Sequence, residues 1–152
     1  MTRRTVPGLF VTGTDTGVGK THVAACIARS LAADGVRVGV YKPAASGCAR
    51  VDGELSSDDA ATLWKAAGCP GDLAAVCPQR FAAPWAPPLA ARAEGREIDA
   101  TLLRTGLQYW LDRADLVLVE GAGGLMSPLT DTEFVADLAD DFGFPLLVVA
   151  AN

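Results

Sequence analysis

The chain has few of the residues from which zinc sites are built. It contains one histidine, His22, and four cysteines, none of which forms a C-x-x-C pair. Structural zinc sites usually need such pairs, or cysteine and histidine together at short spacing. The sequence therefore gives little support to a zinc site. We expect the cysteines to be reduced, and Cys26, inside a helix-like apolar pattern, to be a small core residue.

Positive charge and long hydrophobic runs are also scarce. Thirteen Lys and Arg oppose eighteen Asp and Glu, and the only adjacent basic pair is Arg3 and Arg4, in an expected terminal tail. The formal net charge of −5 argues against a nucleic-acid partner. Apolar runs such as residues 144–151 are strand-length and too short to cross a bilayer. The first ten residues show no hydrophobic core with a cleavage site, so we expect a cytoplasmic protein without a membrane partner.

What the chain does have is enough apolar content for one buried core. Half of its 152 residues are hydrophobic, which argues against disorder. Short apolar runs alternate with helix-length segments. The predicted strands are 8–12, 36–41, 116–120 and 145–150, and the predicted helices are 20–33, 58–67, 89–94, 99–112 and 134–142.

The predicted strands are rich in Val and Leu and lack polar alternation. Such strands are buried on both faces, which predicts an α/β fold with a mainly parallel sheet between helices. The proline-rich segment 77–91 interrupts this rhythm and is predicted to be an ordered loop that leads into a helix. No repeat or linker divides the chain, so we expect one domain.

Residues 13–21, GTDTGVGKT, carry the most specific signal, because they lie between a predicted strand and a predicted helix. In a phosphate-binding loop, N–H groups freed by glycines converge on phosphate oxygens, and the helix N-terminus adds a positive dipole end. Lys20 is expected to reach the terminal phosphates, and the Thr21 hydroxyl to hold Mg²⁺. Thr14 stands where the usual spacing has its first glycine, and a plain glycine-rich turn with a surface lysine is the alternative. We predict that the loop binds a nucleoside triphosphate.

Two further clusters follow predicted strands. The segment YKPAASG at 41–47 places Lys42 and Ser46 at the carboxyl edge of the sheet. A lysine there can neutralise charge during phosphoryl transfer, and a serine can bind a substrate. The segment VEGAGG at 119–124 ends an apolar strand on Glu120, which is the position of a metal-binding acid beside a phosphate loop. Simple surface turns are the alternative in both places.

The segment SSDD at 56–59 has two interpretations. It is a helix N-cap pattern, and on these residues alone capping is favoured. One carboxylate can also cap the helix while the other approaches Mg²⁺, a hard ion that prefers oxygen ligands.

The three motifs at 13–21, 41–47 and 119–124 occur in the same order in dethiobiotin synthetase, and the chain resembles this family over nearly all of its length. The segment SPLTD at 127–131 and the spacing of Pro78, Phe81 and Pro84 resemble it as well. The resemblance implies a homodimeric P-loop nucleoside triphosphate hydrolase-like α/β protein. It also implies a ligase that uses ATP, Mg²⁺ and CO₂ to close the ureido ring of dethiobiotin from 7,8-diaminononanoate, through a carbamate and a mixed anhydride.

The resemblance also assigns roles to individual residues. The catalytic residues that it implies are Lys42, Lys20 and Thr16. The diamine contacts are Thr16 and Ser46. The Mg²⁺ ligands are Thr21, Asp59 and Glu120, since Asp59 rather than Asp58 aligns with the acid of the family. The implied ATP-binding residues are Gly17, Val18, Gly19, Lys20, Thr21, His22, Asp59, Glu120, Gly121, Ala122 and Gly123.

The family pattern continues beyond the last predicted strand, and this difference sets a further expectation. In the family, an L-G-x-x-N-H segment helps to bind the substrate carboxylate across the dimer, and later residues bind adenine. Residues 1–152 contain neither. We therefore expect a single P-loop ATP-binding domain over residues 1–152 that lacks its C-terminal part and is a homodimer in its full-length form.

Three other functions fit a phosphate loop on this fold. A ParA/MinD-like switch ATPase carries a lysine early in its loop, and residues 13–18 contain none. An amidoligase such as cobyrinic acid diamide synthase usually adds a glutaminase domain, which is not visible here. A non-catalytic nucleotide-binding fragment stays open, because function belongs to the site and not to the fold.

Overall fold

The centre of the molecule is a parallel β-sheet. The computed structural model describes residues 5–152, so Arg3 and Arg4 lie outside the described residues. The strand order in the four-stranded sheet is β2-β7-β1-β8. The strands are β1 (Gly8–Gly13), β2 (Val38–Tyr41), β7 (Leu116–Glu120) and β8 (Leu146–Val149). All four predicted strands are thus confirmed, and every neighbouring pair is parallel.

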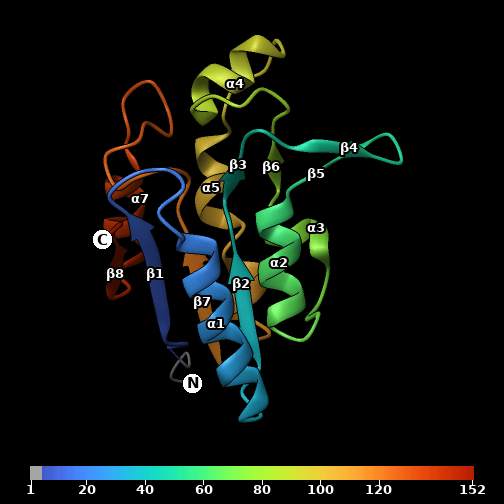
Figure 1. Ribbon diagram of the computed structural model, residues 1–152, viewed down its shortest axis with the longest axis vertical. Helices are drawn as coiled ribbons and strands as arrows, with labels where there is room; N and C mark the ends of the chain where they lie inside the picture. Colours follow the sequence, from blue (N-terminus) through green and yellow to red (C-terminus); the bar gives the residue numbers. More distant parts are fainter. Residues whose placement is uncertain (1–4) are drawn as a thin grey trace.

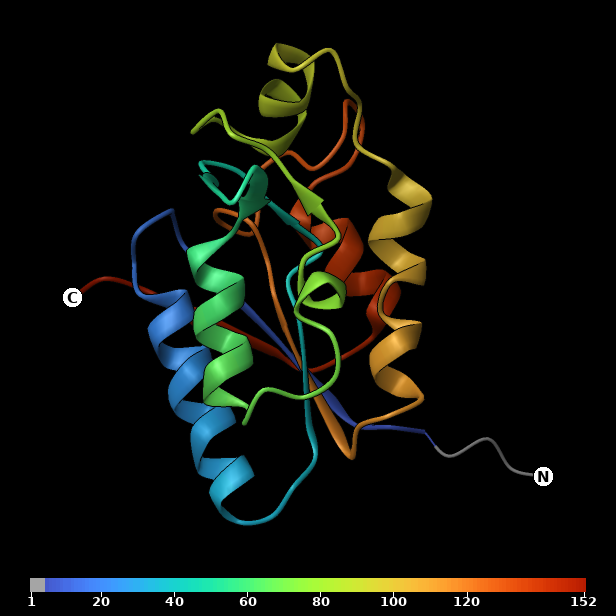
Figure 2. The same cartoon turned by 90° about the vertical axis from the view of Figure 1, so that its right-hand side faces the viewer.

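Helices cover both faces of this sheet and complete three layers (Figure 1, Figure 2). One face is covered by α1 (Lys20–Ala33) and α2 (Asp58–Ala66). The other is covered by α5 (Ala100–Thr105), α6 (Gln108–Leu111) and α7 (Val135–Phe142). The helix α4 (Pro87–Ala93) lies beyond the carboxyl ends of the strands, at the top of Figure 1. The predicted three-layer α/β fold is confirmed. Each helix within residues 5–152 is too short or too polar to cross a bilayer.

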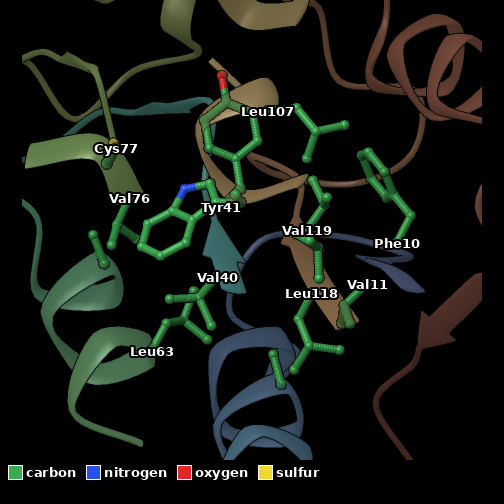
Figure 3. Packing of buried hydrophobic residues seen from close by; sticks show 14 of the residues in the cluster. Phe10, Val11, Val40, Tyr41, Leu63, Val76, Cys77, Leu107, Leu118 and Val119 are labelled. Carbon is green, nitrogen blue, oxygen red and sulfur yellow. The ribbon is translucent and has the colours of Figure 1, made fainter. Parts of the chain in front are cut away.

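The sheet is apolar on both faces because successive side chains of a strand point to opposite layers. In Figure 3, Phe10 and Val11 leave β1 on opposite sides, as do Tyr41 and Val40 on β2. All four are fully buried. The ring of Phe142 from α7 lies 6.2 Å from that of Phe10 and 6.4 Å from that of Tyr41, measured between centroids. Burial on both faces explains why the strands lack polar alternation.

The predicted helix 99–112 is interrupted near Gly106, where α5 ends and α6 begins. The single proton of the Tyr41 hydroxyl is shared between the carbonyls of Leu102, at 3.1 Å, and Leu103, at 2.9 Å. A Cβ atom on Gly106 would lie 2.4 Å from the Tyr41 oxygen, so only glycine fits there without rearrangement. A tertiary contact from the sheet therefore interrupts a helix that the local pattern predicts to be continuous.

Several short elements were not predicted. The two-residue strands β3 (Ala44–Ala45) and β6 (Gln79–Arg80) pair in parallel, so the ordered loop predicted at 77–91 also contains a strand. A hairpin joins β4 (Ala49–Val51) to β5 (Glu54–Ser56), and α3 (Leu73–Val76) follows α2. Asp52 and Gly53 form the hairpin turn with φ values of 51° and 86°. An Asp-Gly pair is a typical sequence signal for such a turn, so the hairpin was predictable.

The prediction for Cys26 was wrong. The buried residues of α1 are Lys20, Ala24, Ala25 and Ala28, which form one stripe of the helix. Cys26 lies outside this stripe and is exposed, with its sulfur 3.8 Å from His22 Nε2. The apolar composition of α1 concealed which side faces the sheet, because alanine and cysteine are tolerated on either side.

Candidate functional site

The sheet register brings the three motifs together at one edge. Val11 of β1 pairs with Glu120 of β7, and Tyr41 of β2 pairs with Val119 of β7. Because the strands are parallel, their carboxyl ends meet. The phosphate loop after β1, Lys42 after β2 and Glu120 at the end of β7 therefore face a common space, as expected for an open α/β sheet.

A cleft of about 540 Å³ opens at this edge. All of the site residues predicted from the sequence line it, except Val18 and Gly121. Val18 instead packs against the loop, since a Cβ atom on Gly13 would lie 2.7 Å from its Cγ2. Gly121 is buried, and a Cβ atom there would lie 2.8 Å from Val135 Cγ1. These two residues shape the walls of the cleft and do not form its surface.

The phosphate loop has the backbone of an anion-binding site. Gly17 and Gly19 adopt positive φ values of 76° and 103°, which residues with side chains rarely adopt. Gly19 is the N-cap of α1 and makes no side-chain capping bond, whereas Ser57 caps α2 and Asp99 caps α5. The first N–H groups of α1 consequently lack a side-chain acceptor. These groups and the helix dipole can bind phosphate oxygens.

Lys20 extends from the first position of α1 into this loop. Its side chain is largely buried, and its ammonium donates a hydrogen bond to the Asp15 carbonyl at 3.2 Å. Burial, followed by the nearby charge of Lys42, lowers the pKa of Lys20. An anion placed beside Lys20 would favour its charged form, so the loop is suited to a polyphosphate.

Lys42, Glu120 and Asp59 form an ion cluster in which Lys42 and Glu120 are buried and Asp59 is exposed. The Lys42 ammonium donates to Glu120 Oε1 at 2.8 Å and lies 3.2 Å from Asp59 Oδ2. Lys42 is 4% exposed and Glu120 is 1% exposed. Burial by itself would lower the pKa of Lys42, but the carboxylates of Glu120 and Asp59 outweigh burial and raise it. Lys42 therefore keeps its positive charge inside the cleft.

The same cluster contains oxygen atoms that can hold a divalent cation. The Thr21 hydroxyl donates to Glu120 Oε1 at 2.8 Å. The second oxygen, Glu120 Oε2, is buried and has no hydrogen-bond partner among residues 5–152. These residues do not contain a group of three or more His, Cys, Asp or Glu side chains placed to hold a metal. Magnesium that is also bound to phosphates needs only one or two carboxylates, so Thr21, Asp59 and Glu120 fit this ion.

The structure resolves the two interpretations of residues 56–59. The Ser57 hydroxyl accepts a hydrogen bond from the Ala60 amide at 3.2 Å and caps α2. The N-cap interpretation is confirmed, with Ser57 and not a carboxylate as the capping residue. Asp59 lies one position further along the first turn of α2, where its carboxylate reaches Lys42.

Two residues of the cleft were not singled out from the sequence. Ser127 lines the cleft, and its hydroxyl accepts a hydrogen bond from the Gly124 amide at 2.8 Å. Trp85 lines it from the proline-rich segment and is 57% exposed. The SPLTD segment was a signal for Ser127, since it contributes to the family resemblance. Trp85 had only the surrounding prolines as a signal.

Gly124 allows two loops to touch behind the cleft. A Cβ atom on Gly124 would lie 3.1 Å from the carbonyl oxygen of Thr14 and 3.2 Å from its carbonyl carbon. The Leu125 amide donates to the Gly13 carbonyl at 3.1 Å. The glycine run after β7 thus supports the backbone of the phosphate loop.

The comparison with protein families agrees with this geometry. The family described as AAA domain matches residues 7–152. The chain belongs to this family. A P-loop family with a parallel central sheet is the fold class that the sequence predicted.

Similar proteins give a more specific description. The ATP-dependent dethiobiotin synthetase BioD of Rhodopirellula baltica is 51% identical over 154 residues, which cover 94% of this chain and 60% of that protein. The enzyme of the same name from Anaeromyxobacter dehalogenans is 52% identical over 143 residues, covering 94% of this chain and 62% of its own length. BioD 1 of Escherichia coli O157:H7 is 40% identical over 140 residues, which cover 92% of this chain and 62% of that protein. The resemblance inferred from the motifs is confirmed, and the chain spans about three fifths of the length of these relatives.

Proposed function

We propose that the protein is an ATP- and Mg²⁺-dependent cyclo-ligase that forms dethiobiotin from 7,8-diaminononanoate and CO₂. The observation that carries the proposal is the position of Lys42, which lies beside Glu120 in the same cleft as the phosphate loop. The phosphate loop can bind a nucleotide without a lysine after β2. A lysine in this position can instead stabilise the charge of a second anion, which here is the carbamate of the diamine. The names of the similar proteins support this reaction.

The nucleotide occupies the phosphate loop in this proposal. The loop amides, the free N-terminus of α1 and the Lys20 ammonium bind the phosphates, while His22 and the residues after β7 line the rest of the nucleotide site. ATP supplies the phosphoryl group that activates the carbamate of the diamine. Thr21, Asp59 and Glu120 hold Mg²⁺, which neutralises phosphate charge when bound.

Lys42 and the hydroxyl-bearing residues act on the diamine side of the cleft. Ser46 and Thr16 line the cleft and can hydrogen-bond the diamine or its carbamate. Lys42 and Lys20 stabilise negative charge that grows on the carbamate and phosphoryl oxygens during transfer. Closure of the ring then requires the second amine to attack the carbonyl carbon of the mixed anhydride in the same molecule, with cleavage of its C–O bond and loss of phosphate and a proton. Correct positioning therefore accounts for much of the acceleration.

The family resemblance also supports a homodimer that works in the cytoplasm. In that arrangement the partner subunit binds the substrate carboxylate. Analytical ultracentrifugation across a concentration series measures whether the protein associates in this way.

The test is formation of dethiobiotin, detected by mass spectrometry, from the diamine, bicarbonate, ATP and Mg²⁺. It is run on this chain and on a version extended to the length of its relatives, with Glu120→Gln as the inactive control. Hydrolysis of ATP without ring closure would favour a ParA/MinD-like switch. Nucleotide binding without either reaction would favour a non-catalytic domain.

A further inference from the structure

The Lys42 ammonium lies between two carboxylates, where a metal ion could also bind. It lies 2.8 Å from Glu120 Oε1 and 3.2 Å from Asp59 Oδ2, and these carboxylates belong to the proposed metal site. The Glu120 side chain is 1% exposed, so water does little to stabilise its charge. A carboxylate buried to this extent needs a nearby positive partner. Lys42 is that partner.

The four charged side chains of this region sum to zero. Lys20 and Lys42 are positive, and Asp59 and Glu120 are negative. A divalent cation bound to Glu120 and Asp59 would face the Lys42 ammonium at the distance of a direct contact. Like charges this close repel strongly inside a protein, where screening is weak.

We propose that Lys42 is a built-in counter-cation of the proposed metal site, and that metal binding displaces its ammonium from Glu120 and Asp59 into the cleft. This inference rests on the proposed function, since it requires the metal site. It gives Lys42 two positions, one that stabilises the metal-free fold and one that faces the diamine. It also implies an order of events, because Lys42 becomes free for the second substrate only after the carboxylates have gained another cation.

The surroundings of Lys42 allow such a movement. The backbone of Lys42 is fixed, because its amide donates to the Val76 carbonyl at 2.7 Å and Pro43 follows it. The polar contacts of the Lys42 side chain are those of its ammonium with Glu120 and Asp59. The cleft that Lys42 lines is also lined by Ser46. The four rotatable bonds of lysine can therefore carry the charge from the carboxylates toward the cleft without a change in the main chain.

The first experiment measures metal binding without nucleotide. Calorimetric titration with Mg²⁺, or with Mn²⁺ as a more tightly binding probe, compares the parent with Lys42→Met. Lys65→Met, which removes an exposed lysine from the end of α2, is the matched control. We expect Lys42→Met to bind the metal about tenfold more tightly than the parent, which corresponds to a coupling of ~1.4 kcal/mol between neighbouring charges. The control is expected to match the parent.

The second experiment measures thermal unfolding of the same proteins. Without metal, Lys42→Met should unfold at a lower temperature than the parent, because Glu120 loses its partner. Added Mg²⁺ should raise the midpoint of this variant more than that of the parent. The double variant Lys42→Met with Glu120→Gln should recover stability without metal and lose the gain in metal affinity.

A third measurement uses the unaltered protein, so it does not depend on the folding of a variant. Acetic anhydride acylates accessible lysines, and peptide masses report the extent at each residue. Mg²⁺ should increase acylation of Lys42 severalfold and leave Lys65 unchanged. If the parent binds the metal while Lys42→Met binds it no more tightly and Lys42 acylation does not change, the counter-cation role is wrong and the metal site stands. If no protein of the set binds the metal, the metal site and this inference both fail.

Discussion

The ammonium of Lys42 lies 2.8 Å from a carboxylate oxygen of Glu120, although 78 positions separate the two residues in the chain. Two neighbouring strands produce this contact, since Tyr41 and Val119 are paired in the sheet just before the two side chains. The ion pair joins the acid that ends β7 to the lysine that follows β2.

The first prediction concerns the nucleotide. Replacing Lys20 with alanine should weaken binding of a non-hydrolysable ATP analogue about 10- to 100-fold, because a charge-assisted hydrogen bond to phosphate is lost. Calorimetric titration in the presence of Mg²⁺ measures the change, and Lys65→Ala is the control for loss of a lysine. Equal affinity in the Lys20 variant would show that the loop does not bind phosphates through this residue.

The second prediction separates chemistry from binding. Lys42→Ala should reduce dethiobiotin formation by about 10²- to 10³-fold, because a fixed cation is most useful where charge develops in the transition state. The same variant should bind the ATP analogue within a few-fold of the parent. The rate is measured on whichever version forms dethiobiotin, either this chain or the one extended to the length of its relatives. Turnover close to that of the parent would make Lys42 a bystander.

The third prediction tests the contact between the two glycine-rich loops. Gly124→Ala places a Cβ atom 3.1 Å from the Thr14 carbonyl oxygen, so the phosphate loop must shift. We expect a loss of about 1–3 kcal/mol in the free energy of unfolding, together with weaker nucleotide binding. Gly35→Ala is the control, since its φ of +81° also disfavours alanine but no atom lies within 4 Å of the new Cβ. This control should lose stability and keep its nucleotide affinity.

The fourth prediction concerns the break between α5 and α6. Tyr41→Phe removes the hydroxyl that donates to the Leu102 and Leu103 carbonyls. The free energy of unfolding should fall by about 1–3 kcal/mol, since the Leu103 carbonyl loses its donor, whereas the Leu102 carbonyl keeps the Gly106 amide. Urea denaturation measures the change. Tyr109→Phe is the comparison, because the Tyr109 hydroxyl accepts a single bond from the exposed Asp72 amide and its loss should cost less.

The fifth prediction concerns thiol reactivity and its dependence on pH. Burial raises the pKa of Cys77 to about 12 and also raises the pKa of Cys48. Iodoacetamide at pH 8 should therefore label the exposed Cys26 and Cys69 and leave Cys48 and Cys77 unlabelled until the protein unfolds. Peptide mass mapping identifies the labelled sites.

The same pKa shift has a consequence for stability. The Cys77 thiol keeps its proton in the folded protein at a pH where an unfolded thiol, with a pKa of about 8.5, has already lost it. Stability should therefore decline as the pH rises above that unfolded value. Cys77→Ser should reduce this alkaline decline. A decline of the same size in the variant would assign the effect to other groups.

Much of the fold and of the site could be predicted because the signals were local. Strands buried on both faces are continuous apolar runs, and this pattern located all four strands of the sheet. The phosphate loop was recognisable because glycines, lysine and threonine stand between a strand and a helix. The wrong prediction, for Cys26, concerned a side chain whose direction depends on small differences in helix phase.

The sequence by itself determined the strand and helix pattern, the phosphate loop and the order of the motifs that place the chain beside dethiobiotin synthetases. Only the tertiary structure decided how the motifs meet. The pairing of Lys42 with Glu120 and Asp59, the division of a helix by the Tyr41 hydroxyl and the contact of Gly124 with Thr14 all join residues distant in the chain. Such contacts depend on strand order, register and the packing of layers, which set distances that no local pattern contains.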